Sequence, residues 1–496
     1  MTDQQQARAS ARERFPLDTI PFMDSLAKQG IWFNKAYSST PLCVPARISM
    51  LTGRYPSVHG VRANPTPRVN GIPRYHQDLF DVMHEHGYTT ALIGKNHSHL
   101  TEKRTDHWFP FSHDAGYYYK LQKTEAEKKF DQWLHDLTQG ISEEPTPFPL
   151  ECQGPYRMVT DAESWVHEVK DNKPFFMWLS FAEPHSPYQV PEPYFSMFPA
   201  AILPPVLADR DSTQSKGFKW QFVSQLGRYA LERYDEKLPR MRSSYYGMMR
   251  LIDDQVKRFA NVLKNEGVLD NTIIFIVSDH GDFAGDYGLM RKGPEMPEDL
   301  IRIPFIVVGP GITPLSKPHP AHISITDIMP TICEIIDVSL PDGTQGRSLW
   351  PLLTGRKYPE KDFSSAYAEQ GFGGLNYDWE DNPAFDRCCF PECIFDCLNE
   401  YTQCGIMRML RKDKCKLVYD MQGRGQLYNL EKDPAELVNL FDNPEYTEIR
   451  YQMIEELLIQ TLRAQDPLPL PGDPSSLKRG QYRRKSHPRN YWTETP

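Results

Sequence analysis

The feature that most constrains the fold of this chain is a series of short apolar runs that each stop at polar residues. The runs lie at residues 89–93, 174–181, 272–277 and 303–308, and the polar residues beyond the first three include Lys95, His185 and Asp279. Open α/β sheets carry their sites where the carboxyl ends of parallel strands meet. We therefore expect these side chains to converge at one edge of a sheet.

Amphipathic stretches separate the apolar runs, and they predict helices at residues 19–29, 77–86 and 242–266. Alternating strands and helices predict an α/β fold with a large mixed, mostly parallel sheet sandwiched by helices, over residues 1–360. A second, smaller α+β domain is expected over residues 361–496. There, a hairpin of residues 416–419 and 426–430 predicts a small antiparallel sheet, followed by a helix at 447–464 and a basic tail.

Composition excludes several classes of protein. The 496 residues carry a formal net charge of -9, which gives no indication of a nucleic-acid partner. No apolar stretch is long enough to cross a membrane, so a membrane partner is not expected. The first fifteen residues lack the apolar core of a signal peptide, which predicts a cytoplasmic protein, or a periplasmic or secreted one if the true start lies upstream.

Six of the nine cysteines crowd together near the start of the second domain. Their spacing matches no zinc ribbon and includes no histidine, which favours reduced thiols, with a disulfide or a metal site as alternatives. The cluster consists of Cys388, Cys389, Cys393, Cys397, Cys404 and Cys415, and the scattered cysteines are Cys43, Cys152 and Cys333.

Residues 41–54 read Pro-Leu-Cys-Val-Pro-Ala-Arg-Ile-Ser-Met-Leu-Thr-Gly-Arg, with Cys43 and Arg47 separated as in a known maturation signature. Further segments follow in a matching order: Gly94-Lys95-Asn96-His97, Pro184-His185-Ser186-Pro187, Ser278-Asp279-His280-Gly281, Lys292-Gly293, and residues 327–331, 346–349 and 427–434. Together they resemble the type I sulfatases, members of the alkaline phosphatase superfamily. The ordered set is far more specific than the cysteine motif alone.

The resemblance implies that Cys43 is the precursor of formylglycine, made by a formylglycine-generating maturase. The hydrated aldehyde is a geminal diol. One hydroxyl attacks sulfur and displaces the alcohol, and loss of the proton from the other then expels sulfate. An isolated cysteine is more often a small buried hydrophobic residue, and the surrounding motif argues against that reading of Cys43.

The resemblance also implies one divalent metal ion, expected to be Ca²⁺ with Mg²⁺ or Mn²⁺ as alternatives, held by Asp3, Gln4, Asp279 and His280. Two features depart from the family pattern. The apolar strand that should precede Asp3 is absent, which we interpret as a mis-set start that leaves the neighbouring strands without a partner. Many members have Asn where His280 stands, which leaves the identity of the metal ion open.

The remaining candidate residues are cations and imidazoles. Arg47 is expected to hold formylglycine, and Lys95 and Lys292 to bind sulfate oxygens. His97 is expected to deprotonate the second hydroxyl, and His185 to protonate or hydrogen-bond the leaving oxygen. Two further histidines, His59 and His99, are expected to belong to the scaffold or the rim.

The predicted function is hydrolysis of a sulfate monoester, with a sulfated small molecule or carbohydrate as substrate. A phosphonate monoester or phosphodiester hydrolase with the same fold and nucleophile is the alternative, and a non-catalytic binding protein on this scaffold is a third hypothesis. Aromatic residues at 367–380, including Phe372, Tyr377 and Trp379, could stack on a sugar or pack in a core. A homo-oligomer is possible from sequence alone.

Overall fold

The computed structural model describes residues 1–496 except 65–76, 114–122, 139, 172, 294, 372–404 and 466–496. Five of the clustered cysteines, the aromatic residues Phe372, Tyr377 and Trp379, and the basic tail therefore lie outside the described residues. The four cysteines within them, Cys43, Cys152, Cys333 and Cys415, are buried free thiols. None of the described helices combines the length and apolar character needed to cross a bilayer.

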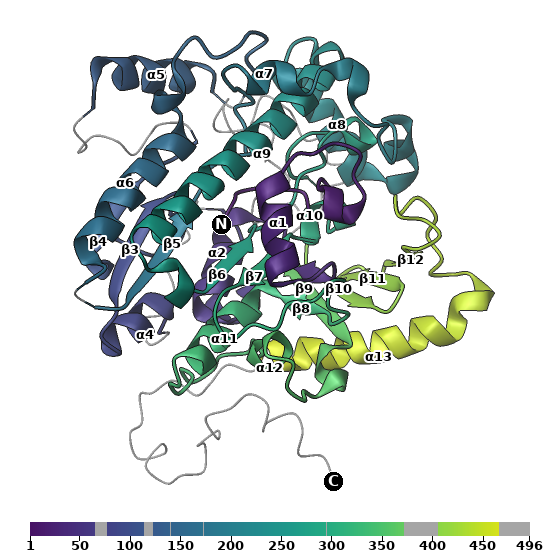
Figure 1. Ribbon diagram of the computed structural model, residues 1–496. Coiled ribbons are helices and arrows are strands. Elements are labelled where there is room, and N and C mark those ends of the chain that lie inside the picture. The colour runs from purple at the N-terminus through teal and green to yellow at the C-terminus, as the bar shows by residue number, and fades with distance from the viewer. Residues whose placement is uncertain are drawn as a thin grey trace.

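Strands from both halves of the sequence build the centre of the molecule (Figure 1). One three-stranded sheet has the order β4-β3-β5 and is parallel throughout, while the other has the order β1-β7-β6 and is antiparallel. A short parallel pair joins β2 and β8. The strands are β1 (Ile31–Trp32), β2 (Ala36–Tyr37), β3 (Thr89–Gly94), β4 (His107–Pro110), β5 (Phe175–Ser180), β6 (Ile274–Val277), β7 (Phe305–Val308) and β8 (Ile323–Ser324). The expected mixed sheet is confirmed.

Helices cover both faces of these strands, so successive residues of one strand are buried on opposite sides of the sheet. Ala91 and Ile93 of β3 join the core formed with α1, α6 and α9, whereas Leu92 between them joins the core on the opposite face with α2, α4, α11 and α12 (Figure 1). The helices are α1 (Pro21–Gln29), α2 (Cys43–Thr52), α3 (Pro56–His59), α4 (Leu79–Glu85), α5 (Glu125–Asp136), α6 (Gly154–Val169), α7 (Tyr194–Met197), α8 (Phe218–Ala230), α9 (Tyr234–Asn265), α10 (Glu298–Ile301), α11 (Ile328–Ile335) and α12 (Trp350–Leu353).

The helix expected at residues 242–266 begins earlier, as α9 shows. Pro239 lies inside its first turns, and Met241, Tyr245 and Tyr246 are buried against the core. Pro239 is the sixth residue of the helix, so it removes the N–H that would bond to the carbonyl of residue 235 and weakens the helix at this point. Packing of the apolar face extends the helix beyond what the sequence pattern predicts.

The C-terminal part is a four-stranded antiparallel sheet in the order β12-β11-β10-β9, with a helix on one face. The strands are β9 (Ser365–Gln370), β10 (Met407–Lys412), β11 (Cys415–Asp420) and β12 (Gly425–Asn429), and the helix is α13 (Thr447–Ala464). Leu410, Leu417 and Leu427 pack beneath Met453 and Leu457 of α13. The hairpin and the helix predicted here are confirmed, while a domain boundary near residue 360 stays a prediction.

The other face of this sheet packs on the large α/β part. Ala368, Met409 and Val418 form one apolar cluster with Tyr37 and Ile301. Alternate residues of the same strands therefore bury against α13 and against the central strands. The C-terminal sheet is held on both faces.

Residues 1–3 take the place where the sequence lacks a strand, between β5 and β6. The Met1 amino group donates to the Leu179 carbonyl and Phe181 N–H donates to the Met1 carbonyl. On the other side, Thr2 N–H donates to the Val277 carbonyl and Thr2 forms a parallel bridge with Ser278. The expected loss of pairing is thus corrected in part, because a short segment bridges the two sheets at the level of Asp3.

Candidate active site

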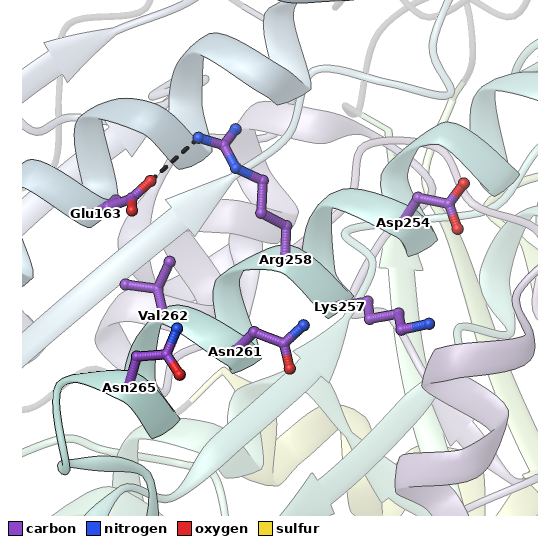
Figure 2. A pocket seen from close by; sticks show the side chains of 7 residues that line it. All are labelled: Glu163, Asp254, Lys257, Arg258, Asn261, Val262 and Asn265. Carbon is purple, nitrogen blue, oxygen red and sulfur yellow. Dashed lines mark hydrogen bonds and ion pairs between the residues drawn. The ribbon is translucent and has the colours of Figure 1, made fainter.

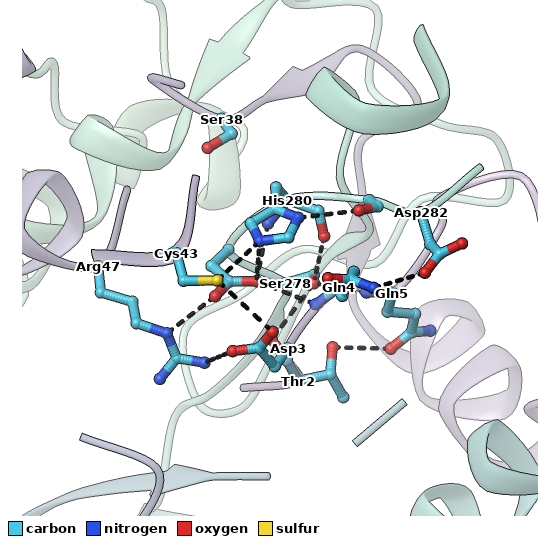
Figure 3. A network of polar contacts seen from close by, with 12 residues as sticks. Thr2, Asp3, Gln4, Gln5, Ser38, Cys43, Arg47, Ser278, His280 and Asp282 are labelled. Atoms are coloured by element: carbon cyan, nitrogen blue, oxygen red, sulfur yellow. Dashed lines mark hydrogen bonds and ion pairs between the residues drawn. The ribbon is translucent and has the colours of Figure 1, made fainter. Parts of the chain in front are cut away.

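The predicted site residues meet at the edge where β3, β5 and β6 end, as the sequence indicated. Lys95 and His97 follow β3, His185 follows β5, and Asp279 and His280 follow β6. Residues 1–3 bring Asp3 between the last two strands, and α2 presents Cys43 at its first turn (Figure 3).

A fully buried arginine ties two carboxylates together at the centre of this edge (Figure 3). Arg47 Nη2 lies 2.7 Å from Asp3 Oδ2, and its Nε lies 2.8 Å from Asp279 Oδ2. Its Nη1 donates to the Lys95 carbonyl and to Ser180 Oγ, both at 2.8 Å. The structure places Arg47 as a clamp on the carboxylates, which differs from the expected grip on the residue at position 43.

Asp3 receives a second cation, since Lys95 Nζ lies 2.7 Å from its Oδ2. Burial alone would raise the pKa of Asp3, but Lys95 and Arg47 hold it well below its usual range. Asp3 is therefore an anion at neutral pH. Its other oxygen, Oδ1, faces the Cys43 sulfur at 3.9 Å.

Cys43 lies against His280, with Sγ 3.1 Å from Nε2 (Figure 3). His280 Nδ1 lies 2.8 Å from the Gly281 carbonyl, which can only accept, so Nδ1 carries a proton and Nε2 is the nitrogen turned to the site. Burial would lower the pKa of His280, but Asp279 and Cys43 raise it to about 9. Burial and Asp3 raise the pKa of Cys43, whereas Lys292, His280 and Lys95 outweigh them and lower it.

The donor set fits a divalent cation. Ligand atoms of Asp3, Cys43, Asp279 and His280 all lie within 4.8 Å of one another and are buried. Gln4 Nε2 donates to Asp282 Oδ2 at 2.6 Å, which leaves Gln4 Oε1 buried without a hydrogen-bond partner among the described residues. A buried oxygen left in this way is suited to bind a cation. Carboxylate and amide oxygens favour a hard cation, and the imidazole nitrogen widens the choice.

The two predicted acid–base histidines are neutral at pH 7. Burial, followed by Lys95 and Arg47, lowers the pKa of His97 well below its usual value. Burial, followed by His113, Lys95 and Lys292, does the same for the pKa of His185. His185 Nδ1 lies 2.7 Å from the Ser186 carbonyl and donates to it, so Nε2 is the nitrogen available to a substrate.

One residue of the site was missed from sequence, namely His113. Its ring lies on the His185 ring, with centroids 4.3 Å apart. It follows β4 by three residues, and β4 is a four-residue strand without the apolar run that marks the other strands. The signal available was only the polar sequence Ser112-His113 after an aromatic stretch.

The histidines expected to be scaffold have partners elsewhere. His59 Nε2 lies 3.2 Å from Ser49 Oγ, and His99 Nε2 lies 2.5 Å from Asp78 Oδ2. Asp78 also caps the start of α4. Both histidines thus contact the supporting structure.

A surface hollow lined by none of these residues lies between α6 and α9 (Figure 2). Arg258 in it pairs with Glu163 at 3.1 Å and also donates to Thr160 and to the Tyr156 carbonyl. Glu163 and Asp254 in this hollow are also engaged, by Arg258 and by the Tyr194 hydroxyl. The hollow is lined by Glu163, Asp254, Lys257, Arg258, Asn261, Val262 and Asn265.

Comparison with known proteins decides the family. The sulfatase family model matches residues 1–338, which include every site residue described above. The chain belongs to the sulfatase family. This is a family of sulfuric ester hydrolases, and its α/β fold belongs to the alkaline phosphatase superfamily.

Known relatives of this sulfatase extend over nearly its whole length. An arylsulfatase of Clostridium perfringens is 28% identical over 474 residues, covering 90% of each chain. The crystal structure of a phosphonate monoester hydrolase of Agrobacterium radiobacter covers 93% of this chain and 94% of its own, with a TM-score of 0.73 and 21% identity. A structure of a protein in complex with its substrate D-glucosamine-2-N,6-O-disulfate covers 95% and 98%, with a TM-score of 0.70 and 21% identity.

Proposed function

We propose that this sulfatase hydrolyses a sulfate monoester on a carbohydrate, with Cys43 converted to formylglycine as its nucleophile. The observation that carries the proposal is the position of Cys43. It is fully buried at the first turn of α2, against His280 and Asp3, in an edge lined by Lys95 and Lys292. Membership of the sulfatase family supports the chemistry.

The first step forms a bond between a hydroxyl oxygen at position 43 and the ester sulfur, while the bond from sulfur to the alcohol oxygen breaks and the alcohol takes up a proton. In the second step the other hydroxyl loses its proton, the carbon–oxygen bond to sulfate breaks, and the aldehyde re-forms. Water then hydrates the aldehyde. A divalent cation held by Asp3, Gln4, Asp279 and His280 would polarise the sulfate oxygens and lower the pKa of the nucleophile.

The chain's own groups divide the remaining work. Lys95 and Lys292 supply positive charge for the oxygens of the anion, and Arg47 pairs with the two metal-binding carboxylates and holds them in place. His97 is neutral and can accept the proton of the second hydroxyl. His185 serves the leaving oxygen through Nε2, and a bound sulfate anion nearby favours the imidazolium that donates there.

A carbohydrate is proposed as the leaving group because of the relatives. One structure of the same fold holds D-glucosamine-2-N,6-O-disulfate, and another relative is named a delta 4,5-hexuronate-2-O-sulfatase. The maturase that would convert Cys43 is a required partner of this proposal. Ca²⁺ is the proposed ion because three of the four ligands offer oxygen.

A phosphonate monoester or phosphodiester hydrolase is the second candidate. Gln4 and His280 are compatible with it, and a phosphonate monoester hydrolase shares the fold. Its substrates carry one negative charge, as a sulfate monoester does, so the charges of the site alone do not separate the two.

Two measurements test the proposal on protein produced with a maturase. Mass spectrometry of the peptide containing Cys43 should show a loss of about 18 Da, as conversion of the thiol carbon to an aldehyde requires. Turnover of 4-nitrophenyl sulfate should exceed turnover of bis(4-nitrophenyl) phosphate and of a phenylphosphonate monoester. The Cys43→Ala variant should fold and show no turnover. Preference for a phosphorus ester would favour the second candidate, and full activity with an unmodified thiol would refute the nucleophile.

A further inference from the structure

His113 reaches the site by the same geometry that places His97. Strands β3 and β4 are parallel, and Gly94 pairs with Pro110 at the end of the ladder. Phe111 N–H then donates to the Gly94 carbonyl at 2.9 Å, which carries the pairing one residue further. His97 and His113 each lie three residues beyond that last pair, so both leave the sheet at its carboxyl edge.

The ring of His113 packs on the ring of His185. The ring centroids are 4.3 Å apart and the ring planes make an angle of 34°. The two residues differ in exposure, because His185 is only 3% exposed while His113 is half-buried. His113 is thus the more exposed residue of the pair, while the buried Asp3, Lys95 and Lys292 interact electrostatically with His185.

Within the described part of the chain, the hydrogen-bond contacts of the His185 ring both involve Nδ1, to the Ser186 carbonyl at 2.7 Å and to Ser186 Oγ at 3.4 Å, so they do not fix the direction of Nε2. Donation to the Ser186 carbonyl fixes one atom of the ring, but the direction of Nε2 depends on what packs against the ring face. Displacing a catalytic group by about 1 Å can cost about a hundredfold in rate. Among the described residues, the aromatic ring found in contact with the His185 ring is that of His113.

We propose that His113 is a positioning residue for the leaving-group step: its ring backs the His185 ring and so holds Nε2 on the ester oxygen that departs. The proposal rests on the proposed role of His185 in ester hydrolysis and adds a residue that this mechanism does not otherwise use. Its action is through His185, and the part of His113 that matters is the flat face of its ring.

This role predicts a dependence on the leaving group. A nitrophenolate departs without much help from an acid, whereas an alkoxide needs a proton or a hydrogen bond as the bond to sulfur breaks. His113→Ala should therefore lower kcat for a sugar or alkyl sulfate by about tenfold to a hundredfold and leave kcat for 4-nitrophenyl sulfate within about threefold. KM should change little for either ester.

Three variants separate this role from others. His113→Phe keeps a flat ring and should restore most of kcat for the alkyl ester. In a His185→Gln background, His113→Ala should cause no further loss, because both changes remove the same interaction. His107→Phe is the matched control, since His107 lies on the same β4 strand but pairs with Asp161 at 2.6 Å and should leave both activities unchanged.

The proposal is overturned if His113→Ala lowers kcat equally for both esters, or if its effect on kcat multiplies with that of His185→Gln. It is also overturned if His113→Phe is as impaired as His113→Ala through a raised KM, which would indicate direct contact with substrate. Unchanged thermal unfolding of His113→Phe guards against loss of folding. Failure of the proposed function is seen separately, as absence of sulfatase activity in the unchanged protein; the same comparison of leaving groups then applies to phosphonate esters.

Discussion

The edge that carries the site and the C-terminal sheet are stabilised in opposite ways. At the edge, Asp3, Arg47 and Asp279 are fully buried charges whose stability depends on one another. In the C-terminal sheet, Leu410, Leu417 and Leu427 pack on α13 and need only to be covered. Removing one charged side chain leaves its partners buried without a counter-charge. Removing one leucine loses the free energy of burying that side chain and leaves a cavity. The comparison separates residues kept for chemistry from residues kept for stability.

The largest effect is expected for Arg47→Met. The methionine fills part of the space, but Asp3 and Asp279 lose their shared cation, which should cost about 3–5 kcal/mol of unfolding free energy. Activity should fall by about a hundredfold to a thousandfold as the carboxylates shift. Urea unfolding and steady-state kinetics measure the two effects. If the variant lost stability while kcat of the folded fraction stayed normal, Arg47 would contribute only to stability, as the leucines do. The contrast between the two regions would then be wrong.

An intermediate effect is expected for Leu417→Ala in β11. Leu417 is fully buried between the sheet and α13, so the variant should lose about 2–5 kcal/mol of stability. The activity of the folded fraction should remain at the level of the unchanged chain. Val418→Ala, on the opposite face of the same strand, is a useful companion because it faces Tyr37 and Ile301. A loss of kcat in Leu417→Ala at full folding would show that the C-terminal sheet shapes the site.

The smallest effect is expected at His322, the residue before β8, which interacts electrostatically with Arg411 of the C-terminal sheet. His322 is 3% exposed, and burial, with Lys35 and with Arg411 of β10, lowers its pKa to about 3. Below its ordinary pKa of 6.5 the unfolded chain binds a proton that the folded chain does not, so His322 makes the protein less stable as the pH falls.

Replacing His322 by Asn removes this proton-linked loss. Between pH 7 and pH 5 the variant should lose about 2 kcal/mol less stability than the unchanged chain, measured by urea unfolding at both pH values. At pH 7 the linkage should contribute little. Equal pH dependence in both proteins would mean that His322 is protonated in the folded state.

The sequence predicted which side chains lie together where the strand ends were marked by apolar runs. Lys95, His185 and Asp279 each follow such a run, and the order of the motifs added Cys43 and Arg47. The partners of Arg47 could not be read in this way, because its carboxylates lie more than forty and two hundred residues away along the chain. Side-chain direction at a helix start depends on packing that no local pattern records.

His113 illustrates the other limit. Strand β4 is short and partly exposed, so it lacks the periodicity that reveals β3 and β5. In the C-terminal sheet, the β11–β12 hairpin was predictable from its turn, while β9 and β10 are separated by residues 371–406 and their pairing is set by the tertiary fold. Turn residues reveal a local hairpin in the sequence, whereas the pairing of two strands across a long insertion leaves no such local pattern.

The bridge made by residues 1–3 places the site between the two central sheets. Among the described strands, β5 pairs only with β3 and β6 only with β7, so Met1 and Thr2 span a seam between the two three-stranded sheets. Lys95 stands on one side of that seam, Asp279 and His280 stand on the other, and Asp3 lies within it. A cation bound there would link the two three-stranded sheets. If the proposed cation binds there, the melting temperature of the protein should rise with the concentration of that cation.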